Sequence, residues 1–203
     1  MRYRCSIIGM SFLCGLVLWT SCDSSKNQEH AYTEFSKADS LTEIYLALQD
    51  TMVQVWNTMI HDDNRKIRTM RNLVHELRVS GYEHPEELDT YETRLEELAK
   101  MRYDQTSISD PEIVSAYDFA SNSLVTELVA VAESQTQFTY NSTLQKMVES
   151  IRSADLRVMN YRAEYDEIAS RFNHFIENNE ALLEEIHPKP FLQKRPLFQM
   201  ASE

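Results

Sequence analysis

Two oppositely charged residues, Asp155 and Arg162, have the types and the spacing to form ion pairs inside a helical protein. They share one stripe of a predicted helix with Val148 and Ala169, so we expect both side chains to project toward the protein interior. They are seven residues apart, which is roughly 10 Å along a helix axis and too far for them to pair with each other. Because buried charges need partners, ion pairs to another helix are expected.

The expected partners lie on the first predicted helix. Arg162 is predicted to pair with Asp62 or Asp63, and Asp155 with Arg65 or Arg71. A polar core layer of this kind fixes the register of packed helices at some cost in stability. We interpret the layer as structural, and a small-molecule or peptide site at the same place is the alternative.

Other residues that could do chemistry form no recognised pattern. His61, His75 and His174 have no His or Glu partner in a metal-ligand spacing. Gly81 is the single glycine after residue 21, so a glycine-rich phosphate loop cannot be built there. Ser, His and Asp occur, but without the strained turn that presents a nucleophile. We therefore predict no metal, no cofactor and no enzymatic activity.

The N-terminal residues indicate an export signal. Arg2 and Arg4 precede an uncharged apolar run over residues 5–21, which ends at Cys22. This pattern predicts a lipoprotein signal peptide over residues 1–21 and lipid attachment, such as palmitate, at Cys22. Two or three acyl chains hold a protein to a bilayer almost permanently. The expected location is the bacterial cell envelope, outside the cytoplasm. An uncleaved transmembrane anchor and ordinary secretion are the alternatives, and the choice between inner and outer membrane stays open.

Charge and cysteine content narrow the expected partners. Removal of two arginines and no acidic residue with the signal moves the net charge from −12 to −14. Such a chain repels DNA, RNA and anionic lipid headgroups. Cys5 and Cys14 lie inside the predicted signal, so no thiol is left for a disulfide, a zinc site or a nucleophile.

The positions of glycine and proline predict the fold class. Long stretches without either residue, such as 39–80 and 112–187, can form uninterrupted helices. Ser40 begins a capping-box pattern, so the first helix is predicted to start there and to end at Gly81. The second helix is predicted from Pro85 to about Arg102.

The second half of the chain predicts two further helices. Residues 104–109 are expected to form a loop, and Asp110, followed by a proline, begins the third helix, which ends within residues 135–140. Ser142 begins another capping box and a helix of about 44 residues. Apolar residues recur on it every seven positions, as in a coiled-coil seam: Leu144, Ile151, Val158, Tyr165 and Phe172.

These elements predict an all-α protein, an antiparallel up-and-down four-helix bundle with long first and last helices, over residues 39–187. Residues 22–38 are polar and are expected to form a flexible tether from Cys22. The tail over residues 188–203 is rich in proline, basic and aromatic residues. We interpret it as a strap that folds back along the bundle, and a partner-docking segment is the alternative.

Seven residues of the last predicted helix form a motif: Asp155, Val158, Arg162, Tyr165, Asp166, Phe172 and Asn173. This motif resembles the fourth-helix signature of the LemA family, without a gap. Matching pieces in the right order are Trp56, Arg65-Lys66, Asn72-Leu73-Val74, residues 128–133 and the tail segment Lys194 to Phe198. The chain departs from the family in having Arg71 for a proline, Asp166 for Asn, Phe172 for Tyr, and Gly81-Tyr82 two residues late.

The resemblance implies a membrane-anchored helical bundle of poorly defined function. Members commonly keep an N-terminal transmembrane segment, hold the bundle outside the cytoplasm, and are encoded near membrane proteases or other envelope proteins. We therefore expect a lipid-anchored, non-enzymatic envelope scaffold or adaptor that interacts with another membrane protein, with homo-oligomerisation left open. A binding module for peptidoglycan, glycan or peptide is the alternative.

Overall fold

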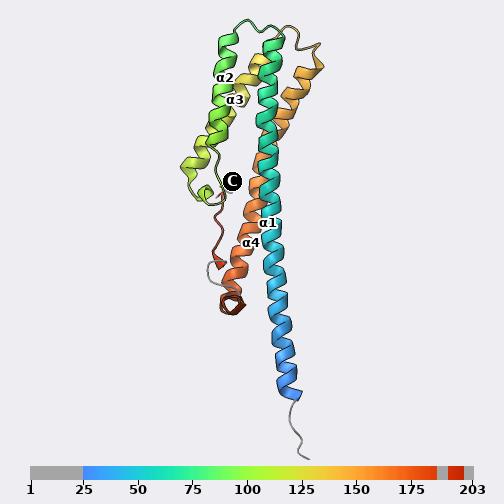
Figure 1. Cartoon of the computed structure of the whole chain (residues 1–203), viewed down its shortest axis with the longest axis vertical. Helices are drawn as coiled ribbons and strands as arrows, with labels where there is room; N and C mark the ends of the chain where they lie inside the picture. The colour runs from blue at the N-terminus through green and yellow to red at the C-terminus, as the bar shows by residue number, and fades with distance from the viewer. Residues whose placement is uncertain (1–24, 187–191, 199–203) are drawn as a thin grey trace, which may run out of the picture. The chain divides into compact units, whose positions relative to one another are not determined.

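The structure, a computed structural model, describes residues 25–186 and 192–198. Its elements are α1 (Ser25–Val79), α2 (Pro85–Lys100), the short 3₁₀ helix η1 (Ser107–Ser109), α3 (Pro111–Ser134) and α4 (Ser142–Ile186) (Figure 1). Since the residues described contain no strand, the predicted all-α class is confirmed. The predicted signal peptide, Cys22 and both ends of the C-terminal tail lie outside these residues.

The chain consists of two compact units, residues 1–37 and 38–203. Helix α1 spans Ser25–Val79, so the predicted helix start at Ser40 is wrong. Residues 25–38, which are the described part of the predicted tether, are helical. These residues contain neither glycine nor proline, and extending a helix costs much less than nucleating one.

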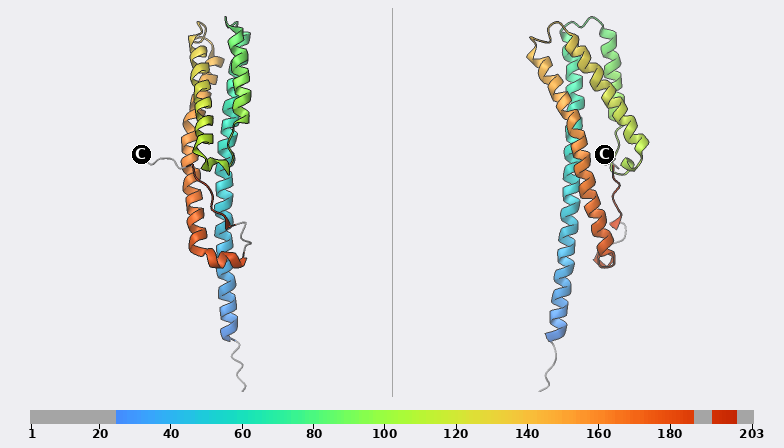
Figure 2. Two further views of the ribbon diagram at one scale, coloured as in Figure 1. Left: turned by 90° about the vertical axis from the view of Figure 1, so that its left-hand side faces the viewer. Right: turned by 180° about the vertical axis from the view of Figure 1, so that it is seen from behind.

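In residues 38–203, apolar side chains from all four helices share one core. Helix α4 lies alongside α1, and α2 lies alongside α3 (Figure 2). An ion pair between Arg94 of α2 and Glu127 of α3 joins the second pair of helices. Fully buried members of the core include Leu73, Leu77, Leu88, Leu95, Leu98, Leu124, Leu128, Leu144, Ile151, Tyr165 and Phe172. Each such side chain stabilises the fold by about 1.5–3 kcal/mol relative to exposure.

Two predicted helix boundaries are confirmed by their capping geometry. Gly81 has a φ of +82°, and the amides after α1 donate to the carbonyls of Leu77 and Arg78 in a Schellman motif. At the start of α3, the Asp110 carboxylate accepts a hydrogen bond from the Glu112 amide. Both signals are local in sequence, so they act in the same way wherever the helix lies in the fold.

The cap of α4 differs from the prediction. Asn141, not Ser142, supplies the capping oxygen, because its side chain accepts hydrogen bonds from the amides of Thr143 and Leu144. The side chain of Gln145 turns instead to the Phe138 and Thr139 carbonyls of the preceding loop. The boundary at Ser142 is nevertheless the one that the sequence predicts.

Candidate functional site

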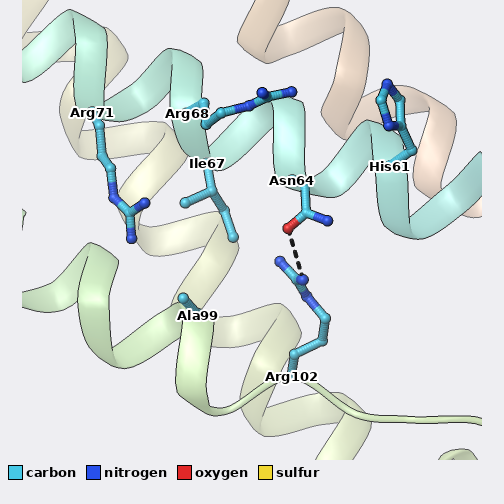
Figure 3. A pocket seen from close by; sticks show the side chains of 7 residues that line it. All are labelled: His61, Asn64, Ile67, Arg68, Arg71, Ala99 and Arg102. Carbon is cyan, nitrogen blue, oxygen red and sulfur yellow. Dashed lines mark hydrogen bonds between the residues drawn. The ribbon is translucent and has the colours of Figure 1, made fainter.

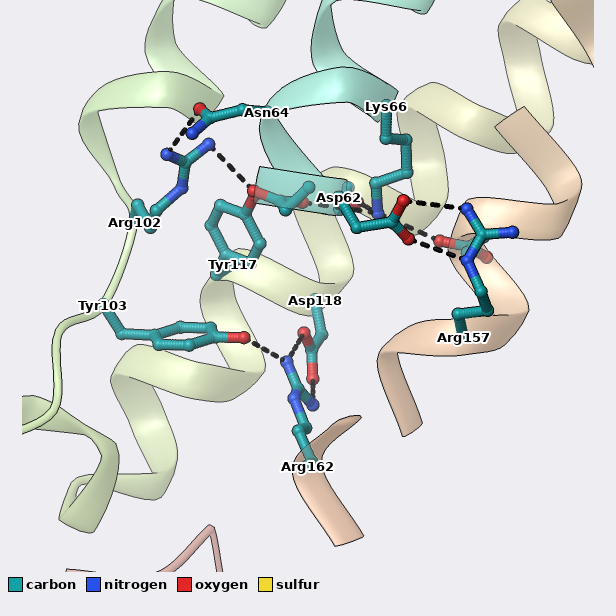
Figure 4. Close-up of polar contacts among 12 residues, drawn as sticks. Asp62, Asn64, Lys66, Arg102, Tyr103, Tyr117, Asp118, Arg157 and Arg162 are labelled. Atoms are coloured by element: carbon teal, nitrogen blue, oxygen red, sulfur yellow. Dashed lines mark hydrogen bonds and ion pairs between the residues drawn. The ribbon is translucent and has the colours of Figure 1, made fainter. Parts of the chain in front are cut away.

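A cluster of polar residues crosses the core at the level of the predicted charged layer (Figure 4). Helix α1 supplies Asp62, Asp63 and Lys66, and α3 supplies Tyr117, Asp118 and Ser121. Helix α4 supplies Asp155, Arg157 and Arg162, and Arg102 and Tyr103 come from the segment after α2. We call these residues the polar cluster. Its most deeply buried members are Asp62, Lys66, Tyr117, Ser121 and Arg162.

Arg162 forms a two-pronged ion pair with Asp118 of α3. Its Nη1 and Nη2 donate to the two Asp118 oxygens at 2.7 and 2.6 Å, and Nη2 also donates to the Tyr103 hydroxyl at 2.9 Å. The prediction that Arg162 pairs with Asp62 or Asp63 is therefore wrong. In the folded chain the arginine faces α3, and the two aspartates of α1 are held by other partners.

The electrostatics of Arg162 follow from this geometry. Burial alone would lower the pKa of the guanidinium, but the hydrogen bonds and charge of Asp118, together with Tyr103, raise it above the usual arginine value. The guanidinium carbon lies 5.1 Å from the ring centroid of Phe198 and 5.4 Å from that of Tyr103. Arg162 thus stays charged in the core, between a carboxylate and two aromatic faces.

Lys66 is the partner of Asp155. Its Nζ donates to Asp155 Oδ1 at 3.1 Å and to Ser121 Oγ at 2.8 Å. Asp155 does pair with α1, but the predicted partners Arg65 and Arg71 are wrong. Arg65 is more than half exposed and pairs with Asp62 on its own helix. The outward orientation of that side chain follows from its place next to Lys66 on α1.

The two aspartates of α1 have different partners. Asp62 accepts two hydrogen bonds from Arg157 of α4, both at 2.9 Å. Asp63 accepts a hydrogen bond from the Tyr117 hydroxyl at 2.5 Å and pairs with Arg102 at 2.8 Å. Burial, and then the adjacent Asp63 charge and hydrogen bond, raise the pKa of Tyr117. The cluster therefore links α1, α3, α4 and the segment after α2 through charge-assisted hydrogen bonds.

Lys66 was missed by the sequence analysis, although a signal for it exists. Met52, Met59, Lys66 and Leu73 follow one another at seven-residue intervals on α1, and all four are buried. A seven-residue step along α1 would have placed Lys66 in the core, as the same step on α4 placed Arg162. Asp118 and Tyr117 carry no comparable signal, because adjacent helical residues point in different directions.

The described part of the tail, residues 192–198, lies along the helices. Asn173 of α4 binds the tail backbone in both directions: its Nδ2 donates to the Arg195 carbonyl at 2.8 Å, and its Oδ1 accepts from the Arg195 amide at 2.7 Å. Asp166 accepts a hydrogen bond from the Phe198 amide at 2.8 Å. Lys194 pairs with Glu177. For these residues the structure agrees with the strap interpretation, and Phe191 lies outside the described residues.

Aromatic side chains surround Phe198 at the end of the described tail. Its ring stacks on Trp56 at a centroid distance of 6.3 Å. It meets the rings of Tyr103 and Tyr165 edge-on, at 5.5 and 5.7 Å. The Arg195 guanidinium lies 5.6 Å from the ring centroid of Phe172. We call the surface of α1 and α4 that these tail residues cover the tail groove.

Four of the motif residues on α1 and α4 lie at the tail groove. Trp56, Tyr165, Phe172 and Asn173 all contact the tail, through rings or hydrogen bonds. Leu73, by contrast, is a core residue, and Asn72 is exposed on α1. Sequence spacing alone did not predict that the motif on α4 and the tail would meet.

Tyr165 carries an unusual polar atom in this groove. The residue is completely buried, and its hydroxyl is a buried polar atom without a hydrogen bond in the described structure. Burial raises the pKa of Tyr165 to about 12, opposed in part by the charge of Arg195. The phenol is therefore neutral at physiological pH.

Within the residues described, no group of three or more His, Cys, Asp or Glu side chains is arranged to hold a metal ion. None of the helices in this part of the chain is both long enough and apolar enough to span a membrane. Comparison of the chain with protein-family models, curated proteins and solved structures found no match.

Proposed function

We propose that the protein is a lipid-anchored, non-enzymatic scaffold or adaptor of the LemA type in the bacterial envelope, built as an antiparallel up-and-down four-helix bundle. The observation that supports a scaffold most strongly is the pairing within the polar cluster. Arg162, Lys66 and Asp62 each meet an opposite charge on another helix. Groups that could act as acids, bases or ligands are thus engaged in holding helices together.

Exposed apolar side chains support an adaptor role. On α4, Leu156 is 77% exposed and Met159 is 51% exposed. Residues three apart on a helix share a face, so the two form an apolar surface on which a helix of another protein can pack. The resemblance to LemA proteins points to a membrane protease or another envelope protein as the partner.

The proposal is tested by crosslinking in intact cells with a tagged full-length chain, followed by mass spectrometry of captured proteins. The adaptor variant is Leu156→Ser with Met159→Ser, and the matched control is Val79→Ser, which alters an apolar residue that is 70% exposed elsewhere. A Cys22→Ala variant tests the anchor. Surface substitutions of this kind change stability by about 0.5 kcal/mol or less, so all variants should fold.

One dominant membrane protein should be captured by the unmodified chain and by the control. The same protein should be lost with the adaptor variant and depleted with Cys22→Ala. Capture of one unchanged set of proteins by every variant would contradict the adaptor proposal.

A peptide-binding module is the second candidate, and the tail groove favours it over peptidoglycan or another glycan. The groove already accommodates an extended peptide through the paired hydrogen bonds of Asn173 and the aromatic rings around Phe198. The test uses a Phe198→Ala chain, which leaves the aromatic site without its own ring, and a labelled peptide of residues 192–203. Binding to this variant but not to the unmodified chain would support the module. Wall fragments that co-purify without any peptide binding would favour a glycan ligand instead.

A further inference from the structure

A pocket of about 420 Å³ opens between α1 and the end of α2. Its lining contains four cationic or cation-forming side chains and no carboxylate: His61, Asn64, Ile67, Arg68, Arg71, Ala99 and Arg102. Arg71 extends from α1 toward the wall that carries Ala99, and Arg102 rises from that opposite wall toward Asn64 (Figure 3). Arginine side chains from two separate parts of the chain thus meet at one cavity.

The arginines of this pocket are poorly neutralised. Asp63 pairs with Arg102, but neither Arg68 nor Arg71 forms an ion pair or a side-chain hydrogen bond with any residue in the described part of the chain. The whole chain has 32 acidic and 20 basic residues, so carboxylates are abundant. Two arginines at one pocket without a carboxylate partner are therefore not what the composition predicts.

The same two helices neutralise an arginine elsewhere along their contact. Arg78 of α1 pairs with Asp89 at 2.8 Å and with Glu92 at 3.2 Å, both on α2. At the pocket, α2 presents Ala99 instead. Because alanine is small and uncharged, α2 supplies no carboxylate at the pocket of the kind that Asp89 and Glu92 supply to Arg78.

From this contrast we infer that the pocket binds a phosphate-bearing anion between Arg71 and Arg102, with Arg68 as a further cation at its rim. Guanidinium groups donate two parallel hydrogen bonds to phosphate oxygens, a geometry that lysine does not offer. Asn64 accepts a hydrogen bond from Arg102 through its oxygen, which leaves its amide NH₂ as a further donor. The bound anion would neutralise Arg68 and Arg71, for which the described part of the chain supplies no carboxylate partner. This site does not depend on the proposed scaffold function.

Two sources can supply this chemistry, a soluble phosphate compound or the phosphodiester headgroup of an anionic lipid. The overall charge of −12 repels both at long range. That repulsion is screened beyond a Debye length of about 8 Å at physiological ionic strength, whereas contacts inside the pocket are not. The arginines of the pocket can therefore attract an anion at short range, although the net charge of the chain is negative.

The test measures binding to the full chain in an uncharged detergent by isothermal titration calorimetry, at matched ionic strength. The probes are inorganic phosphate, pyrophosphate and glycerophosphoglycerol, the last being a soluble copy of a lipid headgroup. The site variant is Arg68→Gln with Arg71→Gln. Its matched control is Lys146→Gln with Arg171→Gln, which removes two exposed positive charges that also have no ion-pair partner among the described residues.

At least one probe should bind the unmodified chain, and the site variant should bind it about a hundredfold more weakly, since each charge-assisted hydrogen bond contributes about tenfold. The control should stay within about twofold of the unmodified chain. Preference for glycerophosphoglycerol would identify a lipid headgroup as the source, and preference for phosphate or pyrophosphate a soluble compound. Equal weakening in both variants, or no binding of any probe at millimolar concentration, would overturn the inference. Urea denaturation of each variant shows whether the fold is intact.

Discussion

Asp118→Asn should destabilise the protein more than Arg162→Met does, although both changes break the same ion pair. The two partners differ in burial: the Arg162 side chain is 4% exposed, whereas that of Asp118 is 36% exposed. Removing the aspartate charge leaves a buried cation without an anion. Removing the arginine leaves a carboxylate that water can reach.

The size of the difference follows from known costs. Loss of one partner from a buried ion pair costs about 3–5 kcal/mol, and partial access of water to this pair reduces the figure to about 2 kcal/mol for Asp118→Asn. Methionine has an arginine-like length and fills the space with apolar atoms. Arg162→Met should therefore cost about 1 kcal/mol, mainly the lost hydrogen bond to Tyr103.

Urea denaturation followed by circular dichroism measures both changes, with the slope of the transition as a check that only stability has changed. In a thermal scan, Asp118→Asn should lower Tm by about 4–8 °C. The double variant should be close to Arg162→Met alone, because no buried cation remains. A parallel cycle with Asp63→Asn serves as the control, and its coupling to Arg162 should stay below about 0.5 kcal/mol.

Two results would refute the reasoning. If Arg162→Met costs more than Asp118→Asn, the arginine contributes through packing or its aromatic contacts rather than through a charge that needs neutralising. If Arg162 couples more strongly to Asp63 than to Asp118, the ion pair described above is not the one that stabilises the protein.

Three further predictions concern the tail groove and the end of α1. Tyr165→Phe should stabilise the protein by about 1 kcal/mol at neutral pH, because it removes a buried hydroxyl without a hydrogen bond. The pKa of Tyr165 is raised from 10.0 to about 12, so its neutral form favours the folded state below pH 10. This contribution to stability is lost as the pH rises from 10 to 12. In urea denaturation, the free energy of unfolding should therefore fall less steeply over that pH range for Tyr165→Phe than for the unmodified chain. Phe198→Ala should cost about 2 kcal/mol and shift the fluorescence of Trp56 to longer wavelength in a Trp19→Phe background, and an unchanged spectrum would contradict the stacking. Gly81→Ala should cost about 1 kcal/mol in urea denaturation, because φ is +82° although a Cβ would meet nothing within 4 Å; a neutral effect would mean that the backbone relaxes there.

The sequence was sufficient for the features that depend on neighbouring residues. Scarcity of glycine and proline predicted the helices, Gly81 predicted the end of α1, and Asp110 predicted the start of α3. The seven-residue period on α4 correctly placed Arg162 in the interior. In each case the residues that decide the outcome are a few positions apart along the chain, so the sequence pattern is enough to predict it.

Which charged residues pair with each other could not be predicted from the sequence in the same way. Whether Arg162 meets Asp118 or Asp62 depends on how far each helix is rotated about its axis and shifted along it, and a shift of one residue turns a side chain by about 100°. The meeting of Trp56, Asn173 and the tail, and of Arg71 and Arg102 at one pocket, depends on the same rotations and on the path of the chain between helices. The sequence by itself determined that the protein is helical and, through the seven-residue period on α4, which face of that helix enters the core, because hydrogen bonding and hydrophobic period are local. Only the tertiary structure decided which charges pair, what the tail covers and where unpaired arginines gather, because those contacts join residues from separate helices.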